Sequence, residues 1–197
     1  MNSKPESKLN MDEPQSVADK SGILSLDQRV YRAFRTKCHP RPLELTISLF
    51  SKTGNWGIFW VVLAAVFAVA YWYTGSEHGR PMIVSVPVVV FSTLLFNSFL
   101  KESLRRERPV SDDPALKPLV GVPSSKSFPS SHAAMSFAAA TILTYIEPPL
   151  APLFYGLALL MSWSRVYVGV HYPSDVLAGT AVGLISGALW TLFFIIF

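Results

Sequence analysis

Three short segments of the chain hold residue types that could do chemistry. They read KESLRRERP at residues 101–109, SFPSSHAAMSF at 127–137 and SRVYVGVHYPSD at 164–175. They offer histidines, an aspartate, cations and small hydroxyl residues, and each lies beside a long apolar run. Ionisable side chains at the edge of a membrane span are costly to keep there, so their presence points to a function.

The third segment places a carboxylate within reach of an imidazole. Asp175 follows His171 by four residues, a spacing that lets the two side chains meet across one helical turn. A carboxylate that holds one ring nitrogen leaves the other in the tautomer that attacks an electrophile or takes a proton. We therefore predict that Asp175 orients His171. Arg165, at the end of the preceding apolar run, adds a cation to this segment.

The first two segments supply further cations and a helix start. Lys101 and Arg108 are seven residues apart, which puts both on one side of a helix that continues for two turns. A basic flank of a membrane span would also explain them. Ser130 or Ser131 suits a helix N-cap, where unpaired N–H groups form a natural anion site. Capping does not explain His132 in the first turn of a membrane span.

These residue types together suit a tetrahedral oxyanion. Arginine gives a bidentate fork and lysine a point charge. A histidine held by an aspartate is a competent nucleophile for phosphorus, and a second histidine can protonate the leaving alkoxide. No carboxylate cluster for Mg²⁺ stands out in the sequence, since Asp112 and Asp113 are typical of a solvated loop. The residues predict metal-independent phosphoryl transfer to water, without a cofactor.

The elements that must position these residues are membrane spans. Half of the 197 residues are apolar and 15% are charged, against roughly a quarter charged in a typical soluble domain. A nucleic-acid partner is not expected, because nothing supplies a basic stripe on a soluble surface. We predict an all-α, polytopic transmembrane helical bundle. Five runs come near the length of about 20 residues that a bilayer requires: 55–74, 82–100, 132–146, 149–163 and 176–197.

The basic residues fall on one face of this predicted bundle. With five alternating spans, the N-terminal segment and the loops at 101–131 and 164–175 share a face that holds 16 of the 17 Lys and Arg residues, all but Arg80. The positive-inside rule predicts that this face, with the N-terminus and the three segments, is cytoplasmic.

The chain divides into three parts. Residues 1–25 are polar and poor in aromatic residues, which favours a disordered tail. Residues 26–53 carry apolar side chains at helical spacing on both sides of Pro40 and Pro42, which predicts two short amphipathic helices. These helices either lie in the membrane interface or pack on the bundle. Residues 54–197 form the transmembrane domain.

Small residues recur in the last predicted span. Gly179, Gly183 and Gly187 stand at every fourth position, a spacing that lets two helices approach closely. We favour packing of this glycine face inside the bundle over a dimer interface. No other feature of the sequence indicates the oligomeric state.

The three segments resemble the signature motifs of the type-2 phosphatidic acid phosphatase family, which shares its core with vanadium haloperoxidases. The match covers roughly residues 85–197, and the Lys–Arg, Ser–His and Arg–His–Asp spacings agree. The resemblance implies a helical bundle, with His171 as the nucleophile that forms a phosphohistidine, Asp175 as its orienting partner and His132 as the general acid. It implies as phosphate ligands Lys101, Arg108, Ser130 and Arg165.

One position departs from the family pattern. The family usually has Gly where this chain has Ser131. If the backbone N–H at this position donates to phosphate, Ser131 still provides it, unless the conformation needs a positive φ.

We therefore expect a membrane lipid phosphatase. Its substrate would be an isoprenoid monophosphate or diphosphate, phosphatidic acid or phosphatidylglycerophosphate. One alternative is a vanadate-dependent peroxidase, which the spans disfavour because such enzymes are typically soluble. Another is a lipid-binding membrane protein with a relic site, which the presence of every catalytic member disfavours.

Overall fold

The computed structural model describes residues 22–35, 40–112 and 117–197, and the regular secondary structure of these residues is helical. The predicted all-α class is confirmed for the described part of the chain. Its elements are α1 (Gly22–Arg35), α2 (Arg41–Thr53), η1 (Asn55–Gly57), α3 (Ile58–Thr74), α4 (Gly79–Leu104), α5 (Pro109–Asp112), α6 (Ser131–Ile146), η2 (Pro148–Leu150), α7 (Ala151–Tyr167) and α8 (Pro173–Ile196).

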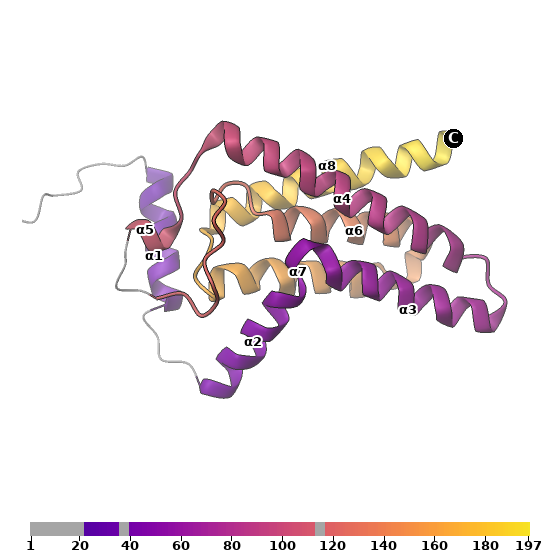
Figure 1. Ribbon diagram of the computed structural model, residues 1–197, viewed down its shortest axis with the longest axis horizontal. Coiled ribbons are helices and arrows are strands. Elements are labelled where there is room, and N and C mark those ends of the chain that lie inside the picture. Colours follow the sequence, from indigo (N-terminus) through magenta and orange to yellow (C-terminus); the bar gives the residue numbers. More distant parts are fainter. Residues whose placement is uncertain (1–21, 36–39, 113–116) are drawn as a thin grey trace, which may run out of the picture.

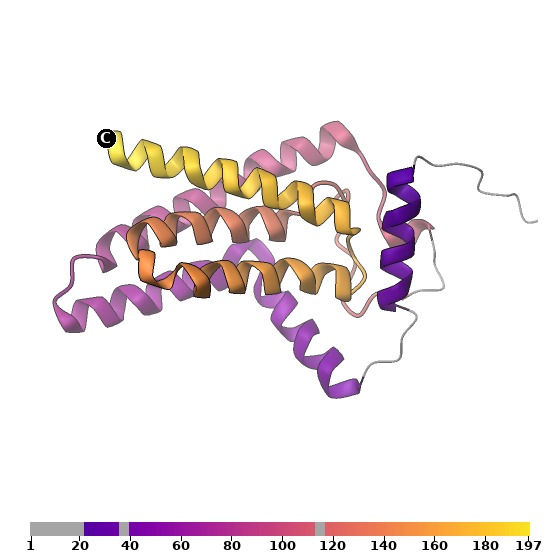
Figure 2. The same cartoon turned by 180° about the vertical axis from the view of Figure 1, so that it is seen from behind.

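Five helices run side by side along the long axis of the molecule: α3, α4, α6, α7 and α8 (Figure 1 and Figure 2). α6 packs against α4, α7 and α8, and nearly all of its side chains from His132 to Leu143 are buried. Small alanines and a few large apolar residues fill its turns, so the neighbouring helices can approach it from several sides. α6 is therefore the central helix, and its first turn carries the second chemical segment.

Three stretches of the described chain are long and apolar enough to cross a membrane: Asn55–Thr74, Gly79–Ser111 and Pro173–Ile196. α6 and α7, with 16 and 17 residues, are shorter; they measure about 25 Å at 1.5 Å per residue, against a hydrocarbon core of about 30 Å. The five predicted spans thus divide into three full-length helices and two shorter ones in the same bundle.

Large apolar side chains remain exposed on the outer helices, among them Val66 on α3, Phe99 on α4 and Leu189 on α8. Exposed apolar surface of this extent is unusual for a soluble monomer and is typical of a face that contacts lipid. The membrane character predicted from composition is therefore also visible in how the bundle places its side chains.

The glycine stripe of α8 faces α6. A Cβ atom at Gly179 or Gly183 would collide with the backbone oxygen of Ser130 or Ala134, and one at Gly187 would collide with the Thr141 side chain. The absence of side chains at these three positions lets α8 approach the backbone of α6. This confirms the predicted role of the stripe in packing inside the bundle.

Two helices form in the N-terminal segment, as the spacing in residues 26–53 predicts. α1 begins at Gly22, so the last residues of the predicted tail, 1–25, are helical; the rest of that tail lies outside the described residues. α1 lies crosswise over one end of the bundle and packs on α7 and α8 (Figure 1). α2 buries Ile47 against the bundle and exposes Leu45. Both helices therefore pack on the bundle, and α2 also keeps an exposed apolar face.

Candidate active site

The three chemical segments meet at one cavity of about 650 Å³. It lies at the start of α6, near the ends of α4 and α7. Six of the predicted site residues line it: Lys101, Arg108, Ser131, His132, Arg165 and His171. Ser130 and Asp175 are fully buried and contact this group from outside the cavity lining. Residues up to 70 positions apart in the sequence therefore surround a single space.

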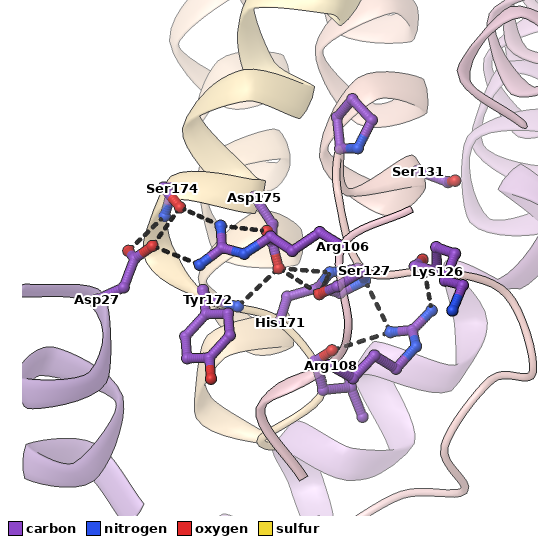
Figure 3. A network of polar contacts seen from close by, with 12 residues as sticks. Asp27, Arg106, Arg108, Lys126, Ser127, Ser131, His171, Tyr172, Ser174 and Asp175 are labelled. Atoms are coloured by element: carbon purple, nitrogen blue, oxygen red, sulfur yellow. Dashed lines mark hydrogen bonds and ion pairs between the residues drawn. The ribbon is translucent and has the colours of Figure 1, made fainter. Parts of the chain in front are cut away.

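His171 and Asp175 are in contact, as their spacing predicts, but His171 lies before the first residue of α8 and not within a shared helical turn (Figure 3). Asp175 lies in the first turn of α8, and its Oδ2 is 3.3 Å from His171 Nδ1. The same oxygen accepts the Tyr172 N–H at 2.9 Å and the Ser127 hydroxyl. Arg108 Nη1 lies 3.4 Å from His171 Nε2. Because a guanidinium only donates, Nε2 is assigned as the acceptor and Nδ1 as the protonated nitrogen that faces the carboxylate.

Lys101 and Arg108 reach the cavity by different routes, because the helix does not continue for the two turns that would put both on one of its sides. α4 ends at Leu104, and Arg105 has a φ of 48°, so the chain turns there. Lys101 therefore approaches from α4 and Arg108 from the segment after the turn. Lys101 Nζ and Arg108 Nη2 both donate to the carbonyl of Lys126, at 2.8 and 3.2 Å. The two cations thus fix the loop that forms one wall of the cavity.

Several buried polar atoms at this site have no hydrogen-bond partner among the described residues: Arg165 Nε, His132 Nε2 and Ser130 Oγ. Arg165 is held from its other side, since its Nη1 donates to Ser51 Oγ of α2 at 2.6 Å. Buried polar groups are nearly always paired in folded proteins. Unpaired atoms that converge beside a cavity lined by cations therefore indicate a site for a polar, anionic ligand.

Ser131 takes the place of the family's usual glycine without strain. It is the first residue of α6 and has helical backbone geometry, so no positive φ is needed there. Its Oγ accepts a hydrogen bond from Asn97 Nδ2 of α4 at 2.8 Å, and the same amide group donates to the Pro129 carbonyl at 3.1 Å. Asn97 therefore ties the start of α6 to α4 and helps to place the wall of the cavity.

The ring of His132 is fixed by close packing. A Cβ atom at Gly54, which follows α2, would lie 2.7 Å from His132 Cδ2 and 2.6 Å from Met161 Sδ. A side chain at this position would force the His132 ring or the end of Met161 to shift. The end of α2 at Gly54 therefore packs directly against the imidazole of His132.

Sequence reasoning missed several residues of the site. Ser127 and Arg106 lie inside the segments 127–137 and 101–109, so their place beside the predicted site residues was a signal that could have identified them. Asn97 lies near the end of the apolar run 82–100, where a polar amide is unusual enough to be noticed. Ser51 and Asp27 contribute from α2 and α1, and their sequence spacing carries no signal for the site.

The environment of His171 predicts an unusual pH dependence. Burial lowers the pKa of the His171 imidazole well below its ordinary value of 6.5, and the neighbouring cations, Arg108 first, lower it further. A lowered pKa keeps the ring neutral as the pH falls through 6.5. We therefore expect the acid limb of kcat/KM that belongs to His171 to lie below pH 6.5.

This prediction is checked by a profile of kcat/KM against pH, which reports ionisations of the free enzyme and substrate. The second ionisation of the substrate phosphate is measured separately and subtracted. An acid limb at or above pH 6.5 that persists after this correction would contradict the prediction.

Comparisons with known proteins cover all three segments. The sequence model of the PAP2 superfamily matches residues 82–195. The decaprenylphosphoryl-5-phosphoribose phosphatase of Mycobacterium tuberculosis is 36% identical over 139 residues, which make up 71% of this chain and 73% of that protein. Among solved structures, the transmembrane PAP2 type phosphatidylglycerolphosphate phosphatase of Bacillus subtilis is 28% identical, with a TM-score of 0.66 over 88% of this chain and 87% of that one.

A bacterial vanadium-dependent iodoperoxidase shares the fold alone. It is 18% identical to this chain, with a TM-score of 0.68 over 86% of this chain and 48% of that one. The shared fold agrees with the core that the sequence resemblance implies.

Proposed function

Because this chain belongs to the PAP2 superfamily, we propose that it is an integral-membrane phosphatase that hydrolyses the phosphate or diphosphate headgroup of a lipid. The observation that carries the proposal is the single cavity that brings together His171, His132 and three cations from distant segments. The unpaired nitrogens of His132 and Arg165 support an anionic ligand in this cavity.

In the first half of the proposed reaction, His171 takes the phosphoryl group. Lys101, Arg108 and Arg165 hold the phosphate oxygens, and the start of α6 at Ser131 adds the positive end of a helix dipole. The lone pair of His171 Nε2 forms the N–P bond while the P–O bond to the lipid breaks. The leaving oxygen keeps the electron pair of that bond and takes a proton from His132.

In the second half, water releases the phosphate. His132 now accepts a proton from water, whose oxygen attacks the phosphohistidine as the N–P bond breaks. Asp175 stabilises the positive imidazole that forms on His171 and keeps its Nδ1 proton in place. Asp175 accepts hydrogen bonds from four groups, so its oxygens are engaged in holding the imidazole and not offered to a metal ion.

We propose an isoprenoid-linked phosphate as the preferred substrate. The name of the mycobacterial relative supports this class, and phosphatidic acid and phosphatidylglycerophosphate are the other candidates. The cavity also has apolar lining, including Leu94 of α4, Trp56 of η1 and Met135 of α6, beside its cations. Such lining suits the first part of a lipid chain next to a charged headgroup.

We also propose that the catalytic face and the N-terminus are cytoplasmic. The proposal rests on the excess of Lys and Arg on this side of the bundle. Positive charge on this face would also attract an anionic headgroup along the membrane surface.

The proposed function is tested with purified protein in detergent and a panel of lipid phosphates, with released inorganic phosphate as the measurement. The panel holds decaprenylphosphoryl-5-phosphoribose, undecaprenyl diphosphate, phosphatidic acid and phosphatidylglycerophosphate. We expect phosphate release that a metal chelator does not reduce. Loss of activity with chelator, restored by Mg²⁺, would contradict the metal-independent mechanism. Halide oxidation that depends on added vanadate, without phosphate release, would favour the peroxidase alternative.

A further inference from the structure

A charged network outside the cavity connects α1 to the carboxylate that holds His171. Figure 3 shows Arg106 between two carboxylates. Arg106 Nη1 lies 2.9 Å from Asp175 Oδ1, and its Nη2 lies 2.8 Å from Asp27 Oδ2. Asp27 belongs to α1, and its side chain is nearly inaccessible to solvent. A buried carboxylate on an N-terminal helix therefore shares one guanidinium with the orienting carboxylate of the site.

Asp27 also caps the helix that carries Asp175. Its Oδ1 accepts the backbone N–H of Ser174 at 3.0 Å, and its Oδ2 accepts the Ser174 hydroxyl. Ser174 is the second residue of α8, where backbone N–H groups have no partner within the helix. A negative charge at this end is also favoured by the helix dipole. Asp27 thus fixes the first turn of α8 from a different helix.

Aromatic contacts hold the same segment from the side. The Arg106 guanidinium lies 4.4 Å from the centre of the Tyr172 ring, a cation–π geometry. Tyr31 of α1 packs edge-on against Tyr172 with ring centres 5.8 Å apart, and its hydroxyl donates to the Gly169 carbonyl at 3.4 Å. α1 therefore contacts the residues before and after His171.

These contacts immobilise the orienting carboxylate. Oδ2 of Asp175 is held by Ser127, Tyr172 and His171, while Oδ1 accepts from Arg106. With both oxygens held, the carboxylate cannot rotate away from the imidazole. We infer that Arg106 and Asp27 are positioning residues, which keep Asp175 aligned so that His171 Nε2 faces the cavity. α1 is then part of the catalytic unit, although the cavity lining includes none of its described residues.

This inference rests on the proposed function and is tested by the variants Asp27→Asn and Arg106→Gln. Because both residues act through Asp175 and not on the phosphate, we expect kcat to fall about tenfold or more while KM changes by less than about threefold. Inhibition by inorganic phosphate should change by less than about threefold, since the cations of the cavity are intact. Unchanged kcat in both variants would overturn the inference.

Two neutralising substitutions serve as matched controls. Arg29→Gln removes an exposed charge from α1, and Arg105→Gln removes an exposed charge next to Arg106. Neither side chain joins the Asp27–Arg106–Asp175 network. We expect both controls to keep kcat within about twofold of the unmodified protein. A loss in the controls equal to that in the test variants would show an effect of net charge and overturn the inference.

A double-mutant cycle separates positioning from general support of the fold. Asp175→Asn alone should lower kcat by up to about 10⁴-fold, because it removes the orienting charge. If Asp27 acts through Asp175, Asp27→Asn should lower kcat by less than about twofold more in the Asp175→Asn background. A loss that multiplies with that of Asp175→Asn would assign Asp27 to another role.

Two further arms cover the remaining outcomes. If Asp27→Asn does not fold in detergent, Arg106→Ala decides, since added guanidinium ion should restore part of its kcat only if the missing cation was positioning Asp175. The activity of His171→Ala shows whether a negative result contradicts the proposed function or only the positioning role of Asp27 and Arg106. An active His171→Ala variant contradicts the proposed function, whereas an inactive one beside fully active Asp27 and Arg106 variants contradicts this inference alone.

Discussion

Replacement of His171 by alanine should abolish phosphate release, with a loss in kcat of about 10⁴- to 10⁶-fold. The substitution removes Nε2, which among the described residues is the one atom that lines the cavity as a nucleophile with an orienting carboxylate behind its ring. The cations of the cavity remain, so inorganic phosphate should still inhibit any residual activity. The measurement is phosphate release from the best lipid of the panel.

The covalent step has a direct readout. Base-stable, acid-labile phosphate should become attached to the unmodified protein when a reaction with ³²P-labelled substrate is stopped with alkali, and His171→Ala should carry none. His78→Ala is the matched control, because His78 is half-exposed and lies at the opposite end of α4 from Lys101. It should keep kcat within about twofold of the unmodified protein. Label in the His171→Ala variant would place the nucleophile on another residue.

The bundle could be predicted from the sequence because its signals are local. Apolar runs locate the spans, and the spacing of Gly179, Gly183 and Gly187 predicts a closely packed face, which α6 occupies. The relation of His171 to Asp175 is also local, since only four residues separate them, although His171 lies before α8 and Asp175 lies in its first turn. Such features depend on apolar runs and on short spacings along the chain, and both are visible in any single sequence.

The outer part of the site could not be predicted in this way. Arg105 and Arg106 are adjacent and chemically identical, yet one is exposed and the other is largely buried between two carboxylates. The difference arises because α4 ends at Leu104 and the chain turns at Arg105, whose φ is 48°. A helix that continued from Lys101 to Arg108 would place these two cations on one side. The turn at Arg105 ends the helix before Arg108 and cannot be seen in the spacing of the residues.

The contributions of α1 and α2 are non-local. Asp27 on an amphipathic helix is most simply interpreted as a solvated charge, and its partner Arg106 is 79 residues away. Ser51, which holds Arg165 across 114 residues, has no distinguishing feature in the sequence. Both contacts follow from how the N-terminal helices pack on the end of the bundle. Sequence reasoning therefore identified the charged residues of the cavity and the nearby partner Asp175, and missed the distant residues Asp27 and Ser51 that hold them in place.

The second large effect is expected from His132→Ala, and its size should depend on the leaving group. With a lipid phosphate, loss of the general acid should lower kcat by about 10²- to 10⁴-fold, because an alkoxide is a poor leaving group without a proton. An aryl phosphate with an acidic phenol needs no protonation, so its first step should be nearly unaffected.

The aryl substrate also separates the two halves of the reaction. If His132 accepts the proton of the attacking water, the phosphohistidine of His132→Ala should form at the normal rate and then hydrolyse slowly. Phenol release should then show a burst equal to the amount of enzyme, followed by a slow phase, whereas the His171→Ala variant should give no burst. If the first step, measured from the burst or in a single turnover, slows equally for alkyl and aryl substrates, the acid role is contradicted. Inhibition by inorganic phosphate is the control that the cavity is intact, since Arg165, Arg108 and Lys101 are unchanged and continue to supply its positive charge.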